Sequence, residues 1–286
     1  MAGLHRGHRG QHPRPAGARP GRGLILRDGG RSARLDGVRV IPLLLLLLLL
    51  PIPAAAIVNA GDPLTTNAKP GPRVALLDAS SAHPEKQRCS GTLIAPDRVL
   101  TAAHCVGELA QMRVVHGRVD LRNAIDGEQR RITSVWTHPD WHAGNSGAIG
   151  NDLAVLTVES PFPGVTPAKL IDSAAPVPVK GILAGWGTVT VAEAAEPEFS
   201  HVLHEAVLPV APDVSCAGFS GFASGSTLCV GYPASDVAAG KPTAGIGDGG
   251  AGWISGGVLA GVLATTQSGG GYNLVVDLRN AKLGKR

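Results

Sequence analysis

The stretch Thr101-Ala102-Ala103-His104-Cys105 places a histidine among small residues, directly before a cysteine. Histidine exchanges a proton near neutral pH, so it is a candidate general base for acyl transfer. Such a base acts on a hydroxyl or thiol that lies beside it. The second decisive stretch is the glycine-rich run at residues 245–252, which reads Gly-Ile-Gly-Asp-Gly-Gly-Ala-Gly and contains no hydroxyl.

Residues 1–56 have the pattern of a basic leader followed by a signal peptide. Nine Arg and only two acidic residues lie within residues 1–40, and eight leucines follow at residues 43–50. The segment ends in Ala54-Ala55-Ala56, and this order predicts a secretory signal peptide that is removed. A membrane anchor is the alternative, but a run of about 10 apolar residues is short for ~30 Å of hydrocarbon. We therefore expect a secreted protein with no stable membrane span after processing.

The charge of the remaining chain excludes one class of partner. Residues 57–286 contain 17 basic and 20 acidic residues, a net charge of −3, so the formal charge of +4 belongs to the leader. A mildly acidic body does not favour nucleic-acid binding. We expect a monomer whose partner is a peptide or protein.

The four cysteines are Cys89, Cys105, Cys216 and Cys229. An even count in an exported chain predicts two disulfides, with three possible connectivities. No Cys-x-x-Cys or Cys/His spacing indicates zinc, and two acids in the polar loop at 126–128 are typical of solvated residues. We expect neither a metal nor a cofactor.

Short alternating runs separated by Gly, Pro, Asp and Asn predict an all-β barrel or sandwich. The expected strands include residues 74–77, 91–94, 112–115, 132–135, 153–156, 181–184, 202–207 and 258–263. Residues 192–199 and 233–243 are typical of loops, and Ser255-Gly256-Gly257 is typical of a hairpin turn.

Six stretches, in chain order, resemble motifs of the chymotrypsin/trypsin-like serine proteases. They are Ile57-Val58-Asn59-Ala60, Cys89-Ser90-Gly91-Thr92-Leu93-Ile94, Thr101-Ala102-Ala103-His104-Cys105, Asn151-Asp152-Leu153-Ala154-Val155-Leu156, Ala184-Gly185-Trp186-Gly187-Thr188 and Leu228-Cys229-Val230-Gly231-Tyr232. The resemblance covers roughly residues 57–280. It implies one domain at 57–286, built of two six-stranded antiparallel β-barrels with the site between them.

The resemblance also implies a role for each matching residue. His104 would be the general base, and Asp152 would hold its imidazole tautomer. The N–H groups of Gly247 and Gly249 would form an oxyanion hole. The remaining assignments are an ion pair between the new α-amino group of Ile57 and Asp248, and disulfides Cys89–Cys105 and Cys216–Cys229.

The chain departs from this family at the nucleophile, where the family has Cys-x-Gly-Asp-Ser-Gly-Gly-Pro. Gly249 stands at the serine position, Gly245 at the cysteine position, and Gly269 near the position of that cysteine's partner. Ser90, Ser146 and Ser255 are not placed to replace the missing serine. The specificity pocket would be formed by Thr243 at its base with Ala264 and Thr266 on its wall, which gives no preference for Arg or Lys and favours small residues.

Two hypotheses follow. The first is a secreted, trypsin-like homologue that is catalytically crippled and binds peptides, a pseudoprotease. The second is an active secreted serine endopeptidase, if Gly249 is a sequence error or an engineered change. A fluorophosphonate probe separates them, because it labels only an activated serine.

Overall fold

The computed structural model describes residues 57–61, 64, 69–142, 146–191, 197–267 and 269–284. The expected leader and signal peptide at 1–56 lie outside these residues. The elements are β1 (Arg73–Asp78), β2 (Gln87–Ala95), β3 (Arg98–Thr101), β4 (Met112–His116), β5 (Glu128–Thr137), β6 (Ala154–Val158), β7 (Lys169–Leu170), β8 (Lys180–Gly185), β9 (His204–Pro209), β10 (Thr227–Val230), α1 (Ala234–Ala238), β11 (Gly252–Ser255), β12 (Val258–Thr266) and β13 (Asn273–Asp277). Short 3-10 turns occur at Pro84–Lys86, Ala103–Cys105, Ser146–Asn151 and Asp213–Ser215.

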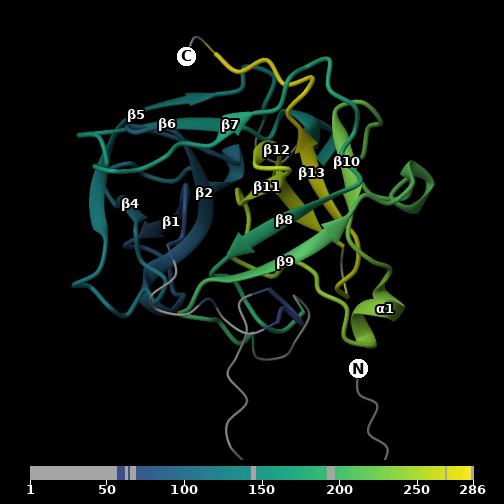
Figure 1. The fold of residues 1–286 in the computed structure, drawn as a ribbon, viewed down its shortest axis with the longest axis horizontal. Helices are drawn as coiled ribbons and strands as arrows, with labels where there is room; N and C mark the ends of the chain where they lie inside the picture. Colours follow the sequence, from purple (N-terminus) through teal and green to yellow (C-terminus); the bar gives the residue numbers. More distant parts are fainter. Residues whose placement is uncertain are drawn as a thin grey trace, which may run out of the picture. The chain divides into compact units, whose positions relative to one another are not determined.

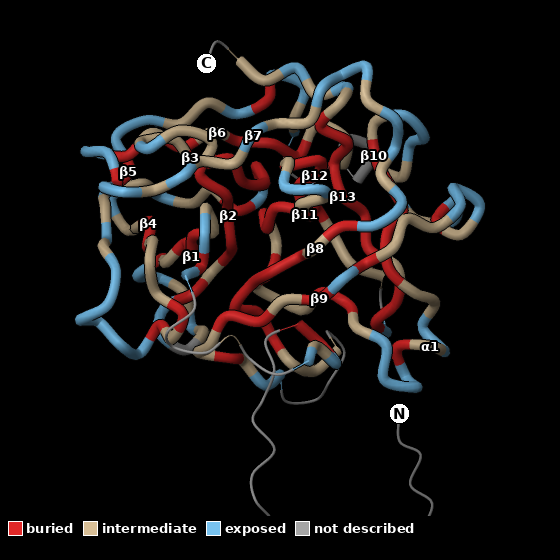
Figure 2. The backbone as a smooth tube through the Cα atoms, viewed as in Figure 1, coloured by how far each residue is buried: buried red, intermediate tan, exposed pale blue. Residues whose placement is uncertain are grey.

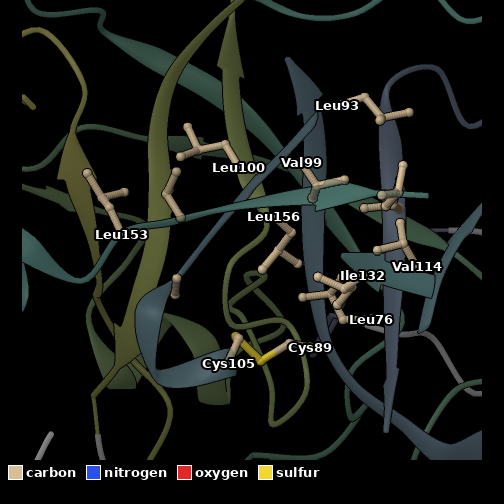
Figure 3. Packing of buried hydrophobic residues seen from close by; sticks show 14 of the residues in the cluster. Leu76, Cys89, Leu93, Val99, Leu100, Cys105, Val114, Ile132, Leu153 and Leu156 are labelled. Atoms are coloured by element: carbon tan, nitrogen blue, oxygen red, sulfur yellow. A yellow bond between two sulfur atoms is a disulfide. The ribbon is translucent and has the colours of Figure 1, made fainter. Parts of the chain in front are cut away.

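The first half of the domain is a closed antiparallel barrel of six strands. Its strand order is β1-β2-β3-β6-β5-β4, and β1 pairs back with β4 (Figure 1). Side chains alternate between the inside and the outside of the barrel, as in β6, where Ala154, Leu156 and Val158 are buried. The inward residues form one apolar cluster in which Leu76, Leu100 and Leu156 take part (Figure 3).

The second half of the domain is a curled antiparallel sheet with the strand order β10-β13-β12-β11-β8-β9. A bridge between Val210 and Val230, with the Ala211 N–H donating to the Cys229 carbonyl at 2.8 Å, joins its two edge strands. The short strand β7 pairs in parallel with β12 outside this order. The prediction of an all-β fold with two six-stranded halves is confirmed, and β7 is an addition to it.

A separate apolar cluster fills the second half. Its largest side chain is Trp253, which is fully buried together with Leu183 and Leu208. The ring lies directly over Gly181 of β8, where a Cβ atom would come within 2.5 Å of it. Only glycine fits at this point of the strand, because interiors are packed without room for an extra methyl group. Figure 2 shows the buried residues running through the strands of both halves.

The structure contains the two disulfides Cys89–Cys105 and Cys216–Cys229. Their sequence separations are 16 and 13 residues. Closing a loop of about 15 residues stabilises a fold by about 3 kcal/mol in the chain-entropy account. Cys89–Cys105 ties β2 to the turn that carries His104, so it fixes that turn to the barrel.

The expected elements differ from the observed ones in a few places. Residues 233–243 were expected to be a loop, and this was wrong for Ala234–Ala238, which form the helical turn α1. The strand expected at 202–207 begins at His204, while Val202 forms only a bridge with Asp120. Residues 192–196 of the expected loop lie outside the described residues. In the part of the chain described here, no helix has the length and apolar character needed to cross a bilayer.

Candidate active site

His104 and Asp152 meet at one edge of the first barrel. His104 lies in the 3-10 turn that follows β3, and Asp152 lies just before β6. Because β3 and β6 pair antiparallel, with Thr101 opposite Ala154, the end of one strand meets the start of the other. His104 Nδ1 lies 2.6 Å from Asp152 Oδ2, and the His104 backbone N–H donates to Oδ1 at 2.9 Å. The carboxylate holds the ring proton on Nδ1, so Nε2 is left as the basic atom.

Gly249 lies directly against the other end of this imidazole. A Cβ atom at Gly249 would be 2.6 Å from His104 Nε2 and 3.6 Å from Cys105 Sγ. The Ser90 N–H holds the segment in place by donating to the Gly249 carbonyl at 2.8 Å. The fold therefore brings together the three positions expected to hold the base, the orienting acid and the nucleophile, but the third position carries no side chain.

The described hydroxyls near this point do not replace a nucleophile. Ser90 is buried with Oγ 3.4 Å from the Gly247 carbonyl, and Thr101 donates to the Ser90 carbonyl at 2.8 Å. Ser255 donates to the Lys180 carbonyl at 2.7 Å, at the β11–β12 hairpin turn expected from its sequence. The side chain of Ser146 lies outside the described part.

The glycine-rich run supplies two backbone donors beside the imidazole. Among the residues that the structure describes, neither the Gly247 N–H nor the Gly249 N–H donates to an acceptor. Gly247 has φ 94°, a conformation in which glycine is strongly favoured. Its carbonyl accepts a 2.7 Å hydrogen bond from Gln87 Nε2. Gln87 was not identified from the sequence, because this contact joins residues that are 160 positions apart.

Asp248 is a fully buried carboxyl group inside the same run. Its Oδ1 accepts from the Gly187 N–H at 2.9 Å, and its Oδ2 accepts from the Gly245 N–H at 2.8 Å. Loss of solvent raises the pKa of Asp248 to about 7, although these two backbone hydrogen bonds oppose the rise. A buried carboxyl with this pKa lacks the stabilisation that a cation would give its charged form.

Ile57 lies beside the loop that carries Asp248. Its side chain is fully buried in the cluster that includes Ala244, directly before the glycine-rich run, and Ala251, inside the run. The next residue, Val58, forms a bridge with Thr243, whose N–H donates to the Val58 carbonyl at 3.1 Å. Ile57 has φ 90°, a strained value for a β-branched residue.

The site opens into a cleft of about 530 Å³. Its wall contains His104, the loop at 244–247 with Gly249, the end of β12 from Leu263 to Thr266, and Ser81, Ala82, His83, Arg88 and Cys89. Ala264 and Thr266, expected on the pocket wall, lie there. Thr243, expected at the pocket base, is fully buried and does not line the cleft.

Asn273 is the buried hydrogen-bond partner of two cleft residues, Ala244 and Thr266, and of Thr243. The Thr243 hydroxyl donates to the Gly271 carbonyl at 2.7 Å, while Thr266 Oγ1 and the Ala244 N–H donate to Asn273 Oδ1 at 3.0 and 3.2 Å. Asn273 is fully buried. It was not identified from the sequence, because a single amide before the apolar run Leu274-Val275-Val276 belongs to no motif.

One group of metal-type ligands occurs among the described residues, namely Cys89, His104 and Cys105. Both sulfurs belong to the disulfide, so neither is a thiolate ligand. His201 Nδ1 lies 3.7 Å from Glu85 Oε1, and Asp126 accepts a hydrogen bond from Asn123 in its loop, so each residue has a polar side-chain neighbour.

Comparisons with known proteins identify one family. A family model described as Trypsin matches residues 61–276. The chain is 32% identical to a trypsin of Saccharopolyspora erythraea over 157 residues, which is 53% of this chain and 66% of that protein. It is 27% identical to a trypsin of Sus scrofa over 150 residues, which is 50% of this chain and 61% of that protein. The chain thus spans less than two thirds of the length of these relatives.

Solved structures with the same fold have lower identity. Neuropsin, a serine protease expressed in the limbic system of mouse brain, superimposes with a TM-score of 0.64 at 21% identity, covering 77% of this chain and 94% of that chain. Human heparin binding protein superimposes with a TM-score of 0.61 at 20% identity, covering 79% and 99%. At this identity the two structures support the fold alone.

Proposed function

The chain belongs to the trypsin family of serine proteases, and from this premise we propose that it is a secreted member that binds peptides without forming an acyl-enzyme. The observation that carries the proposal is the contact between Gly249 and the imidazole. A Cβ at this glycine would lie 2.6 Å from His104 Nε2, so the base faces the nucleophile position and finds no hydroxyl there.

The backbone around this position favours binding of a peptide carbonyl. The N–H groups of Gly247 and Gly249 have no acceptor among the described residues, and both glycines line the cleft. A glycine supplies its N–H as well as a serine does, so the missing side chain does not remove the donor. Thr266 lines the cleft, and its hydroxyl donates to the buried Asn273. A side chain held at this wall supports a preference for a small bound residue such as Gly, Ala or Ser.

Processing after Ala56 would complete this site. It would create an α-amino group on Ile57, beside the loop that carries the fully buried Asp248. An ammonium group there would stabilise the charged carboxylate, whose pKa is raised by burial to about 7 in the unprocessed chain. The expected signal peptide and the two disulfides support export to an oxidising compartment.

The second candidate function is serine endopeptidase activity. It is favoured by the 2.6 Å contact between His104 and Asp152, which a protein without catalysis does not need. It requires a serine at position 249, so resequencing of codon 249 decides whether this candidate applies.

Binding and turnover of one peptide test the proposal. A fluorescent tetrapeptide amide ending in alanine is titrated against the exported protein and followed by anisotropy, and its cleavage is followed by mass spectrometry. We expect saturable binding of the alanine peptide and no cleavage. A matched peptide ending in arginine should bind with lower affinity. Cleavage at the alanine, or no binding of either peptide, would refute the proposal.

A further inference from the structure

The pair of His104 and Asp152 retains the parts of a general base although the serine is missing. The carboxylate of Asp152 is buried and binds both the ring N–H and the backbone N–H of His104. This contact fixes the tautomer and the ring plane, so Nε2 is basic. His104 also lines the cleft, and its side chain is 37% exposed, so solvent reaches the ring.

A carbonyl group has a place beside this base. Gly247 and Gly249 line the same cleft as the imidazole, and their N–H groups have no acceptor within the described part of the chain. Backbone donors of this kind stabilise the oxyanion that forms when a nucleophile attacks. The hydroxyls of Ser90 and Thr101 donate to backbone carbonyls, and those of Ser81 and Thr266, which line the cleft, donate to Gln87 and Asn273. Water is therefore the nucleophile that we assign to Nε2.

We propose that the protein hydrolyses activated carboxylic esters by direct attack of a water molecule, with His104 as the general base. This inference rests on the proposed function, because it uses the same cleft and the same backbone donors. It adds a serine-independent activity and a substrate class, namely small acyl esters of acidic alcohols such as phenols.

The reaction balances without any further reagent. His104 Nε2 takes one proton from water while the resulting hydroxide forms a C–O bond to the ester carbonyl. The oxyanion accepts hydrogen bonds from Gly247 and Gly249. It then collapses, the bond to the phenol oxygen breaks, and the imidazolium returns its proton to the leaving phenolate. The products are one carboxylic acid and one phenol, and no bond to the protein forms at any stage.

The choice of ester follows from the leaving group and the pocket. A phenolate leaves readily, whereas an amine leaves only after full protonation at the correct moment, so amides are poor substrates for this route. Thr266 and its hydrogen bond to Asn273 restrict the acyl side. Acetate esters should therefore react faster than longer acyl esters.

The test measures hydrolysis of p-nitrophenyl acetate by the exported protein and by two histidine variants. His104→Ala should lower kcat/KM by about 10²–10⁴, the usual contribution of a positioned general base. His142→Ala is the matched control, because His142 is an exposed histidine that does not line the cleft, and it should leave the rate unchanged. The wild-type reaction should slow in D₂O, show no initial burst of p-nitrophenolate and resist fluorophosphonate treatment.

Three results would overturn the inference: equal rates for wild type and His104→Ala, a burst of p-nitrophenolate, or inhibition by fluorophosphonate. The first would assign the reaction to surface groups, and the other two to a covalent intermediate. Peptide binding measured on the same samples distinguishes failure of this inference from failure of the proposed function. Retained binding without His104-dependent hydrolysis overturns this inference alone, whereas loss of both overturns the proposed function as well.

Discussion

The buried carboxyl of Asp248 makes the stability of the unprocessed chain depend on pH in an unusual direction. Its pKa is about 7 in the folded chain, compared with an ordinary value of 3.8. Below pH 3.8 the group is protonated in both the folded and the unfolded state, so it imposes no penalty. As the pH rises towards 7, the unfolded state releases this proton while the folded state keeps it. The free energy of unfolding therefore falls across this window and becomes level above it.

The size of the effect follows from the shift in pKa. Three pKa units at 1.36 kcal/mol each give a loss of about 4 kcal/mol between pH 4 and pH 8. In a chain that begins at Ile57, the new ammonium group offsets the desolvation of Asp248, so most of this loss should disappear. Asp248→Asn removes the titrating group and serves as the control for every other ionisable residue.

Urea unfolding of the full chain, the chain starting at Ile57 and the Asp248→Asn variant measures this effect. The buried side chains of Trp186 and Trp253 provide the fluorescence signal. The free energy of unfolding of the full chain, minus that of its Asp248→Asn variant, should decline between pH 4 and pH 7. A difference that stays constant or rises over this range would show that Asp248 is already paired with a cation, and the reasoning would be refuted.

Four further predictions concern the pocket, the loop, the disulfides and processing. Thr266→Gly removes the hydroxyl bound to Asn273 and deepens the pocket, so affinity for peptides with larger terminal side chains should rise about 10- to 200-fold in anisotropy titrations, and unchanged selectivity would contradict this. Gly247→Ala places an alanine at a φ of 94° with its Cβ 2.5 Å from Gln87 Oε1. It should lower the free energy of unfolding in urea by about 1–3 kcal/mol and weaken peptide binding. Wild-type stability and binding would contradict a role of this loop in the site. Non-reducing peptide maps should show Cys89–Cys105 and Cys216–Cys229, and replacing Cys216 and Cys229 by alanine should cost about 2–5 kcal/mol; any other pairing contradicts the fold. N-terminal sequencing of the exported protein should begin at Ile57, and a start elsewhere would reject the pairing with Asp248.

The sequence pointed to candidate site residues where they lie in contiguous motifs. His104, Asp152 and Gly249 were proposed because each lies in a short stretch that resembles or departs from a family motif, and the fold brings these stretches together. The strands with clear alternation were also located. The short strands β3, β7, β10, β11 and β13 were not among the expected strands, since so few residues do not show a clear period.

The contacts that shape the cleft depend on distant pairs and escaped the sequence analysis. Gln87, in the first half, donates a hydrogen bond to the Gly247 carbonyl in the second half. Asn273 accepts hydrogen bonds from Ala244 and Thr266. Neither residue belongs to a recognisable motif. Their roles follow only from the folded arrangement, in which a strand of one half lies against a loop of the other. The cysteine spacing likewise left three connectivities open, and only the resemblance selected one.

Fluorophosphonate labelling of the wild type and the Gly249→Ser variant, side by side, tests the central claim most directly. The claim is that the base and the backbone donors are in place and that the nucleophile alone is missing. The wild type should remain unlabelled, while a folded Gly249→Ser variant should be labelled once the imidazole shifts to admit the new side chain, which would otherwise lie 2.6 Å from His104 Nε2. Loss of such a nucleophile lowers turnover by about 10⁶, so the contrast should be complete on the time scale of the assay. A labelled wild type, or a folded variant that stays unlabelled, would contradict the account.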